Sequence, residues 1–318
     1  MGQLPFETIK REILVKKEYK AEYGKTPEER TTKELINFGI VNIDKPQGPT
    51  SHQVSDYVQK ILNIKKAGHS GTLDPRVTGI LAVALGRATR IVQALLPAGK
   101  EYVTLMHLHK PIEEKKIRKV FKDFTGKIRQ KPPIKSAVRR VERTRNIYYI
   151  DVIEIQGQEV LFKVGCQAGT YIRKLCHDIG KKLGCGAHMA ELRRTKVASF
   201  NESTAYTLQD LTDAFHYYKK ENKDKFLRKI IQPMENGINH LPKIWILDST
   251  IKPLSHGRDL AIPGISRIHS NIKKQDLVAI MTLKDELVAL GIAILSSEDI
   301  MKKDKGMAIR IDKVFIQS

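Results

Sequence analysis

The chain has 318 residues and carries 56 Lys plus Arg against 35 Asp plus Glu, a formal net charge of +21. This one-sided excess of cations predicts a polyanionic partner, because basic side chains that neutralise phosphates release condensed counterions. An anionic membrane is the weaker alternative, since the sequence shows no long apolar span, lipidation pattern or signal peptide. We therefore expect a cytoplasmic protein that binds nucleic acid and no membrane. Its length and its hydrophobic content of 41% predict two domains with buried cores.

Residues 1–35 form a charged extension with little hydrophobic periodicity, which we expect to pack on the C-terminal domain. The sequence GIVNIDKPQGPTSHQV (39–54) then predicts a short apolar strand, a turn, and a helix that begins at Thr50 or Ser51. Lys45 flanks this turn, so a structural role is favoured over a catalytic one.

The segment GHSGTLDPRVT (68–78) holds a single aspartate behind two glycines. Pro75 disfavours the α region for Asp74, so this carboxylate belongs to a loop or turn. The run ILAVALG (80–86) that follows predicts a buried strand, although so short a run also fits a helix. From these residues alone, Asp74 is open to two interpretations, a turn-forming or capping residue and a functional carboxylate.

Two further elements follow this loop. ATRIVQALLP (88–97) predicts a short helix that ends at Pro97, and KEYVTLMHLH (100–109) alternates apolar and polar residues as a strand does. Tyr102 lies early on the predicted strand. It is either a tyrosine packed at a sheet edge or an aromatic platform on which a base stacks.

A strongly basic segment occupies residues 126–145, with one acid, Glu142, among eight cations. Charge runs are usually solvated faces, but a stretch this poor in acids between a helix and a strand suits a loop that clamps a phosphate backbone. The cations are Lys127, Arg129, Lys131, Lys135, Arg139, Arg140, Arg143 and Arg145.

The segment VLFKVGCQAGTYIRKLCHDIGKKLGCG (160–186) predicts a strand followed by a helix. Thr170 is the expected N-cap of this helix, and Gly184 is its expected end. Arg173 falls in the first turn, where the helix dipole disfavours a cation. We therefore expect Arg173 to have a carboxylate or phosphate partner.

Three cysteines, Cys166, Cys176 and Cys185, make an odd number with no CxxC pair, which is typical of a reducing compartment. With His177 and His188 nearby, a zinc site is the alternative to buried core thiols. The thiols are favoured, because Cys176 falls on the apolar face of the predicted helix. From about residue 240, short β-prone runs separated by charged turns predict a small β barrel.

From about residue 36 to 317 the motifs, taken together, resemble the tRNA pseudouridine synthase B family, most closely the archaeal, dyskerin-type catalytic protein of H/ACA ribonucleoproteins. The motifs are GIVNIDKPQGPTS, GHSGTLDPRVTGIL, KEYV, GTYIRKLCHDIG and GAHMAELRRT, with HGRDLAIPGI and DLVAIMTLKDELVALG similar to a PUA domain. Ser70 departs from the glycine that relatives often carry. The resemblance implies an α+β fold, a mixed sheet flanked by helices plus a small PUA β-barrel, with the catalytic domain at 36–238 and the PUA domain at 239–318.

The resemblance also implies the site. Asp74 is the expected catalytic carboxylate, Arg173 pairs with it, and Tyr102, Tyr171 and Leu192 bind the substrate. The implied reaction breaks the N1 to C1′ bond of uridine, turns the base and joins C5 to C1′, with no cofactor or metal. Contacts with RNA are expected from His69, Lys131, Lys135, Arg139, Arg140, Arg143, His256, Gly257 and Arg258.

The implied partners are an H/ACA guide RNA, which pairs with the sequences flanking the target uridine in rRNA or tRNA, and three small proteins. These are a small peptide-like subunit, a Gly/Arg-rich-type β-barrel subunit and a kink-turn-binding protein. A stand-alone tRNA T-loop pseudouridine synthase and a non-catalytic RNA-binding scaffold are the alternatives. The scaffold does not explain Asp74 and Arg173 jointly.

Overall fold

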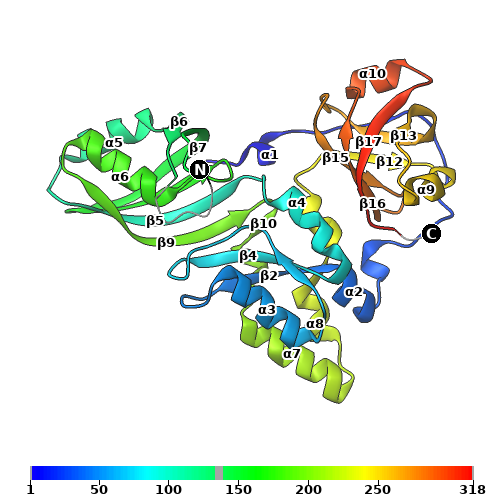
Figure 1. Cartoon of the computed structure of the whole chain (residues 1–318), viewed down its shortest axis with the longest axis horizontal. Helices are drawn as coiled ribbons and strands as arrows, with labels where there is room; N and C mark the ends of the chain where they lie inside the picture. Colours follow the sequence, from blue (N-terminus) through cyan, green and yellow to red (C-terminus); the bar gives the residue numbers. More distant parts are fainter. Residues whose placement is uncertain (1, 133–138, 317–318) are drawn as a thin grey trace.

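The computed structural model describes residues 2–132 and 139–316 of the chain, which are organised around two β-sheets (Figure 1). The ten-stranded sheet pairs β4 with β9 in parallel and its other neighbours antiparallel. Its main path is β11 (Ile231–Pro233), β2 (Gly39–Lys45), β4 (Thr78–Leu85), β9 (Ala187–Val197), β5 (Lys100–Leu108), β8 (Glu159–Cys166), β7 (Arg143–Gln156) and β6 (Gly126–Gln130). Two short strands, β3 (Ala67–His69) and β10 (Phe200–Asn201), pair with β4 and β9 respectively.

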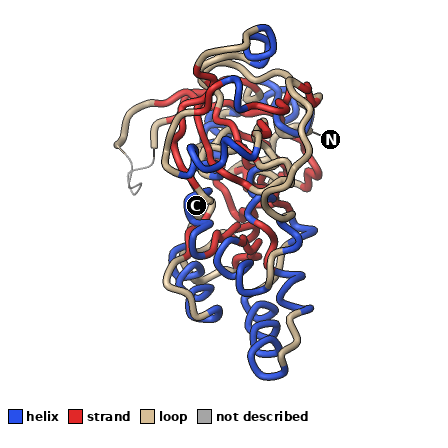
Figure 2. The backbone as a smooth tube through the Cα atoms, turned by 90° about the vertical axis from the view of Figure 1, so that its right-hand side faces the viewer, coloured by secondary structure: helices blue, strands red, loops and turns tan. Residues whose placement is uncertain are grey.

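Helices cover both ends of this sheet. Near β5, β7 and β8 lie α5 (Glu114–Asp123) and α6 (Ile172–Leu183), and near β2 and β4 lie α2 (Thr32–Phe38), α3 (Ser51–Leu62), α7 (Leu208–Glu221) and α8 (Lys225–Ile230). Helices α3, α7 and α8 form the end of the molecule that lies lowest in Figures 1 and 2. The predicted helix at 88–97 is a 3-10 segment, η2 (Gly86–Ile91), continued by α4 (Val92–Leu95). In the described part of the chain, no helix has the length and apolar character needed to cross a membrane.

Strands β2 and β4 are buried on both faces, which explains their continuous apolar sequence. Along β4, Leu81 and Val83 pack in the core that contains α3, α7 and α8. Ile80 and Ala82 point to the other face, into a core shared with η2, α4 and the second sheet. The run at 80–86 is therefore a strand up to Leu85, and the alternative helix is excluded.

The seven-stranded sheet contains residues from both termini. Its order is β1 (Ile13–Val15), β14 (Ile265–His269), β12 (Lys243–Ile246), β15 (Leu277–Met281), β16 (Leu287–Ala293), β17 (Met307–Val314) and β13 (Leu260–Ala261), with α9 (Asp248–Ser255) and α10 (Ser297–Lys302) beside it. Strand β1 pairs antiparallel with β14. Part of the N-terminal extension thus packs on the C-terminal sheet, while α1 (Pro5–Thr8) lies nearer the ten-stranded sheet, where the Gly2 N–H donates to Asp151 Oδ2 at 2.9 Å.

A buried ion-pair network joins the extension to both sheets. The guanidinium of Arg30 donates to both carboxylate oxygens of Glu235, at 2.7 and 2.8 Å, and lies 3.4 Å from Glu286 on the turn between β15 and β16. Glu235 also accepts the N–H of Leu287 at 3.0 Å. The side chains of Arg30 and Glu235 are only 6% and 7% exposed, so each depends on the other for its charge compensation.

We expect Arg30→Met to destabilise the chain by about 3–5 kcal/mol, because it leaves Glu235 buried without its cation. Thermal unfolding followed by the fluorescence of Trp245, which lies in the core between the two sheets, measures the effect. Arg118→Met is the matched control, since it removes a half-exposed ion pair with Glu114 and should cost less than about 1 kcal/mol. Equal thermal unfolding midpoints for Arg30→Met and Arg118→Met would contradict the structural role of Arg30.

Two expectations from the sequence were wrong. Thr170 does not cap α6: the helix begins at Ile172, and the Thr170 hydroxyl donates instead to the Gln167 carbonyl at 2.7 Å within the preceding turn. The basic segment 126–145 is not wholly a loop either. Its ends form the hairpin strands β6 and β7, because alternate residues such as Ile128 pack against the core under the sheet.

Candidate active site

Asp74 lies on the loop between β3 and β4, and neighbouring elements fix the backbone on both sides of it. The hydroxyl oxygen of Ser51, at the start of α3, accepts the N–H of Leu73 at 2.8 Å. The ammonium group of Lys45 is buried and donates to the carbonyl of Val77 at 2.8 Å. Lys45 therefore has the structural role favoured from its sequence context, and Asp74 stands on an immobilised loop.

The carboxylate of Asp74 faces Arg173 in the first turn of α6. Nη2 of Arg173 donates to Oδ2 of Asp74 at 2.5 Å, so the expected ion pair is present with a single hydrogen bond. The Arg173 and Asp74 side chains are 60% and 55% exposed. A pair this exposed contributes little to stability, so the fold alone does not explain it. The carboxylate of Asp74 is therefore accessible from the surface.

Tyr102 and Leu192 lie on adjacent strands of the same sheet. Tyr102 on β5 is paired with Arg194 on β9, and Leu192 is paired with Thr104, two residues along. Both side chains are partly buried against the core under α6. Burial raises the pKa of Tyr102, and the charge of Asp74 adds to the rise while Arg194 opposes it. Because β5 lies between β8 and β9, the sheet-edge interpretation of Tyr102 is wrong.

Arg194 is a site residue whose burial the sequence analysis missed. The residue is 1% exposed, and its guanidinium donates to the carbonyls of Ile80, at 2.7 Å, and Gly71, at 3.1 Å. It also lies against the hydroxyl of Tyr102, and burial lowers the pKa of Arg194. One cation thus contacts both the loop that carries Asp74 and the tyrosine beside it. The paired arginines of ELRRT were the only sequence signal.

Lys100 is another buried cation, close enough to Arg194 for the two charges to interact. Its ammonium group donates to the carbonyls of Leu95, Leu96 and Ala98 at 3.0, 2.7 and 2.8 Å. Burial lowers its pKa to about 7, and the charge of Arg194 contributes to the shift. Gly71 has φ +125°, a backbone conformation that favours glycine, and a Cβ added there would lie 3.8 Å from Cε of Lys100 and 3.9 Å from Nη1 of Arg194.

His69 stands at the start of the Asp74 loop. Its Nδ1 accepts the N–H of Gly71 at 3.3 Å. Its ring packs edge to face against the ring of His52, with the two ring centroids 4.7 Å apart. Burial, with smaller contributions from His52 and Arg194, lowers the pKa of His69 to about 4. The ring is therefore neutral near pH 7 and offers an aromatic surface without a charge.

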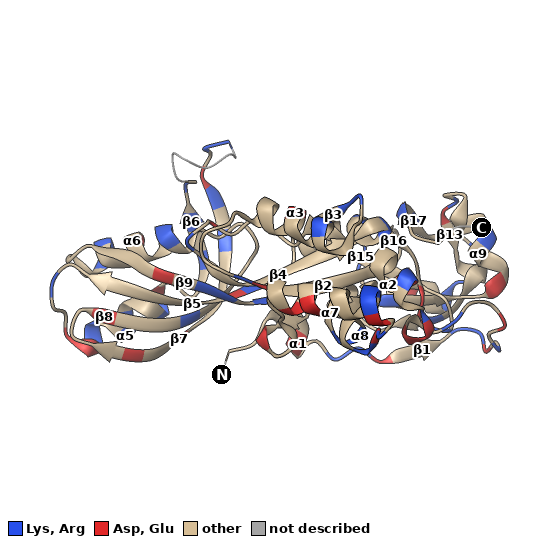
Figure 3. Ribbon diagram, turned by 90° about the horizontal axis from the view of Figure 1, so that it is seen from below, with Lys and Arg blue, Asp and Glu red and all other residues tan. Residues whose placement is uncertain are grey.

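Tyr171 directly precedes α6, and the side chain of Gln130 hydrogen-bonds both its backbone N–H and its carbonyl. Gln130 ends β6, at the base of the basic hairpin. In Figure 3, Lys and Arg gather along β6 and the first residues of β7, at one edge of the ten-stranded sheet. Among the predicted RNA contacts here, Lys131, Arg139, Arg140 and Arg143 are exposed. The predicted contact Lys135 lies outside the described residues.

The remaining predictions concern RNA contacts near α9 and a zinc site. His256, Gly257 and Arg258 are exposed at the C-terminal end of α9, beside the seven-stranded sheet (Figure 1), whereas Asp74 lies on a loop of the ten-stranded sheet. Among the residues that the structure describes, no cluster of His, Cys, Asp or Glu is arranged to hold a metal ion, and the three cysteines are buried free thiols. These residues therefore do not support the zinc alternative.

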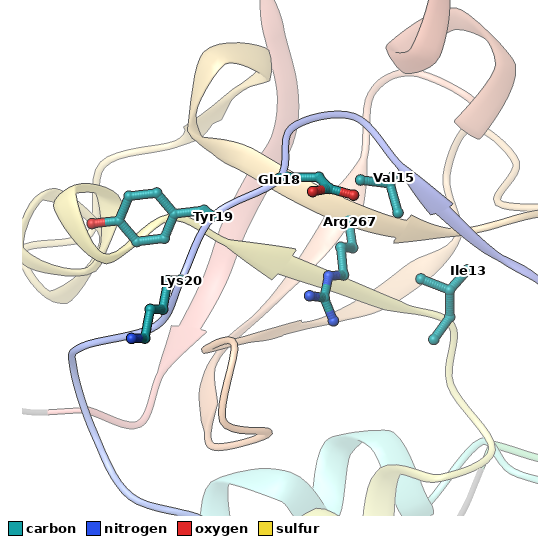
Figure 4. A pocket seen from close by; sticks show the side chains of 6 residues that line it. All are labelled: Ile13, Val15, Glu18, Tyr19, Lys20 and Arg267. Atoms are coloured by element: carbon teal, nitrogen blue, oxygen red, sulfur yellow. The ribbon is translucent and has the colours of Figure 1, made fainter.

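A surface groove of about 660 Å³ lies beside β1, where Figure 4 shows Arg267 from the neighbouring strand with residues of the extension. No residue of the Asp74 site lines this groove. The lining residues are Ile13, Val15, Glu18, Tyr19, Lys20 and Arg267.

Comparison with known proteins decides the family. A family model described as TruB family pseudouridylate synthase (N terminal domain) matches residues 59–112 and 109–172, and the tRNA pseudouridylate synthase B C-terminal domain matches 173–239. A DKCLD domain matches 3–55, and a PUA domain matches 242–315. A relative named probable tRNA pseudouridine synthase B, from Thermococcus kodakarensis, is 58% identical over 97% of this chain and 92% of its own length. The chain belongs to the TruB family of pseudouridine synthases.

Other members of the TruB family agree with this assignment. The probable tRNA pseudouridine synthase B of Pyrococcus furiosus is 56% identical over 97% of this chain and 92% of its own length. A Cbf5–Nop10–Gar1 complex contains a chain that is 55% identical, with TM-score 0.95 and coverage of 99% of this chain and 96% of that one. An H/ACA RNP bound to a substrate RNA containing 2′-deoxyuridine contains a chain that is 52% identical, with TM-score 0.92 and coverage of 99% and 98%. The expected α+β fold, a pseudouridine synthase sheet plus a PUA domain, is confirmed.

Proposed function

We propose that this TruB-family chain isomerises uridine to pseudouridine in rRNA or tRNA targets chosen by a guide RNA, as the catalytic subunit of an H/ACA ribonucleoprotein. The observation that carries the catalytic part is the exposed Asp74–Arg173 pair on an immobilised loop. The observation that supports the guided part is the similarity, over nearly the whole chain, to structures of an H/ACA RNP with substrate RNA and of a complex with Nop10 and Gar1.

The chemistry that we propose starts at Asp74. The N1 to C1′ bond of uridine breaks, the base turns, and a C5 to C1′ bond forms, after which the hydrogen on C5 leaves as a proton and N1 regains one. Asp74 acts either as a nucleophile at C1′ or C6, or as a base that removes a sugar proton; its exposed loop position suits each. Arg173 donates a hydrogen bond to the carboxylate and orients it. All of these steps are redox-neutral.

A stacked uridine cannot reach Asp74, so the target nucleotide must be flipped out, which costs a few kcal/mol. We assign Tyr102 as the surface on which the flipped base stacks, with Leu192 and Tyr171 as further contacts. The partly buried ring of Tyr102 near Asp74 supports this assignment. Stacking on an aromatic ring contributes about 1–3 kcal/mol, enough to offset much of that cost.

Tyr102→Ala should weaken binding of the target RNA by about 1–3 kcal/mol, because the stacking surface is lost. Tyr102→Phe should retain most of the affinity, because the ring remains. Titration of labelled substrate RNA into the assembled particle measures both. Equal losses in the two variants would show that the hydroxyl, and not the ring, carries the interaction.

The partners and location belong to the same proposal. We infer three small subunits, namely the peptide-like, the Gly/Arg-rich-type and the kink-turn-binding proteins, and we infer that the PUA domain holds the ACA end of the guide through surfaces that include His256, Gly257 and Arg258. The exposure of these three residues supports that role. We retain the boundaries 36–238 and 239–318 for the two domains, and a cytoplasmic location, which three free thiols support.

A stand-alone tRNA enzyme is the second candidate, because curated relatives carry the name probable tRNA pseudouridine synthase B. Release of tritium from 5-tritiated uridine in a target rRNA distinguishes the two. Release that requires both the guide and the small subunits supports the guided enzyme. Release from a tRNA T-loop alone, with none from the guided rRNA target, would establish the stand-alone enzyme instead.

A further inference from the structure

The base of the β6–β7 hairpin is joined directly to the residues that lead into α6. Gln130, the last residue of β6, is 3% exposed. Its Nε2 donates to the carbonyl of Tyr171 at 3.2 Å, and its Oε1 accepts the N–H of Tyr171 at 3.0 Å. One buried side chain therefore holds both hydrogen-bonding groups of a single backbone residue, and that residue stands two positions before Arg173.

The opposite strand of the hairpin holds the same loop. The N–H of Asn146 on β7 donates to Oε1 of Gln167 at 3.1 Å, and the N–H of Gln167 donates back to the Asn146 carbonyl at 2.8 Å. The guanidinium of Arg145 covers Gly169, with its Nη2 3.1 Å from the place where a Cβ would stand. Residues 167–171 are thus held from both strands of the hairpin.

The Asp74–Arg173 pair itself lacks packing that could fix its geometry, since both side chains are more than half exposed. The relative position of the two side chains must therefore be set by the backbone at Asp74 and the backbone at Arg173. Ser51 and Lys45 hold the backbone at Asp74. On the other side, the contact between Gln130 and Tyr171 holds the start of α6. A catalytic carboxylate needs its partners within a fraction of an ångström, so both supports matter to the reaction.

We propose that Gln130 is a positioning residue for the isomerisation: by fixing the backbone at Tyr171 it sets the position from which Arg173 reaches Asp74. The inference rests on the proposed function, because the reaction supplies its readout. The β6–β7 hairpin would then have two roles. Its exposed cations are candidate phosphate contacts, and its base orients the catalytic pair.

The test compares Gln130→Leu with wild type in the assembled particle. Single-turnover release of tritium from saturating 5-tritiated target RNA should fall about 10-fold to 100-fold, because small misplacements of catalytic groups cost this much. The affinity for guide and substrate RNA should stay at the wild-type value. Gln158→Leu is the matched control: its Nε2 donates to the Leu108 carbonyl at 2.6 Å at the far end of the same sheet, and its loss should leave the rate unchanged.

Two further variants separate positioning from simple loss of structure. Gln130→Glu keeps an acceptor for the Tyr171 N–H but loses the donor to the Tyr171 carbonyl. Its isomerisation rate should therefore lie between those of wild type and Gln130→Leu. This comparison remains informative even if the leucine variant folds poorly. When Gln130→Leu is combined with Arg173→Lys, the double variant should lose less than the product of the single losses, because Gln130 acts through Arg173.

The outcomes distinguish this inference from the proposed function. If wild type releases tritium and Gln130→Leu matches Gln158→Leu, or if the two losses multiply fully in the double variant, Gln130 has no positioning role and the proposed function stands. If the wild-type particle releases no tritium with its RNA bound, the proposed function and this inference fall together.

Discussion

Asp74→Asn should lower single-turnover isomerisation at least about 10³-fold, equivalent to about 4 kcal/mol of the activation barrier. The substitution keeps the size of the side chain and the hydrogen bond to Arg173, but it removes the charge needed for attack or proton abstraction. Since the Asp74 side chain is 55% exposed and the loop is held by Ser51 and Lys45, the fold should be unaffected. Tritium release from 5-tritiated uridine measures the rate, and a filter-binding titration measures RNA affinity.

Asp56→Asn is the control for this substitution. Asp56 is an exposed aspartate on α3, the helix that also contributes Ser51, so it tests for the general loss of one negative charge. Its rate should equal that of wild type. A wild-type rate in Asp74→Asn would remove Asp74 from the mechanism, whereas parallel losses of rate and RNA affinity would reassign it to RNA binding.

Arg173→Met has the second largest expected effect, a fall of about 10²–10³-fold in the isomerisation rate. The methionine has a similar length but cannot hold or stabilise the carboxylate of Asp74. Arg173→Lys should lose less, because the ammonium group retains the charge but not the planar donor geometry. Single-turnover rates at saturating substrate give the comparison, since a defect confined to RNA affinity disappears under that condition.

Arg118→Met provides the matching control for Arg173, because it also removes an arginine from an exposed ion pair on a helix, here with Glu114 on α5. That variant should keep the wild-type rate. If Arg173→Met and Arg118→Met behaved alike, the pair at Asp74 would be an ordinary surface contact.

Local sequence rules were sufficient for part of the site. Pro75 placed Asp74 on a loop, the apolar run after it indicated β4, and helical spacing indicated α6 with Arg173 in its first turn. Each of these depends on neighbours within a few residues. The unfavourable position of Arg173 at a helix N-terminus also pointed to an anionic partner, which the structure identifies as Asp74.

The buried cations could not be predicted in this way. Lys45, Lys100 and Arg194 belong to residue types that are normally exposed. Each is buried because backbone carbonyls need a donor there: Lys45 and Arg194 serve carbonyls of the segment around Asp74 that are distant in sequence, whereas Lys100 serves carbonyls just before it in the chain. Gln130 was missed for the same reason, since its contact with Tyr171 spans 41 positions. Packing of the extension on the C-terminal domain was expected, but its strand β1 and the pairing of Arg30 with Glu235 were not.

The central claim is that this chain places a pseudouridine where a guide RNA directs it. The most direct measurement exchanges the guide in the assembled particle and maps pseudouridine in one RNA that contains two target sites. The account predicts that modification moves from the first site to the second with the guide, and that Asp74→Asn leaves both sites as uridine. Modification that stays at one site whichever guide is present would contradict it.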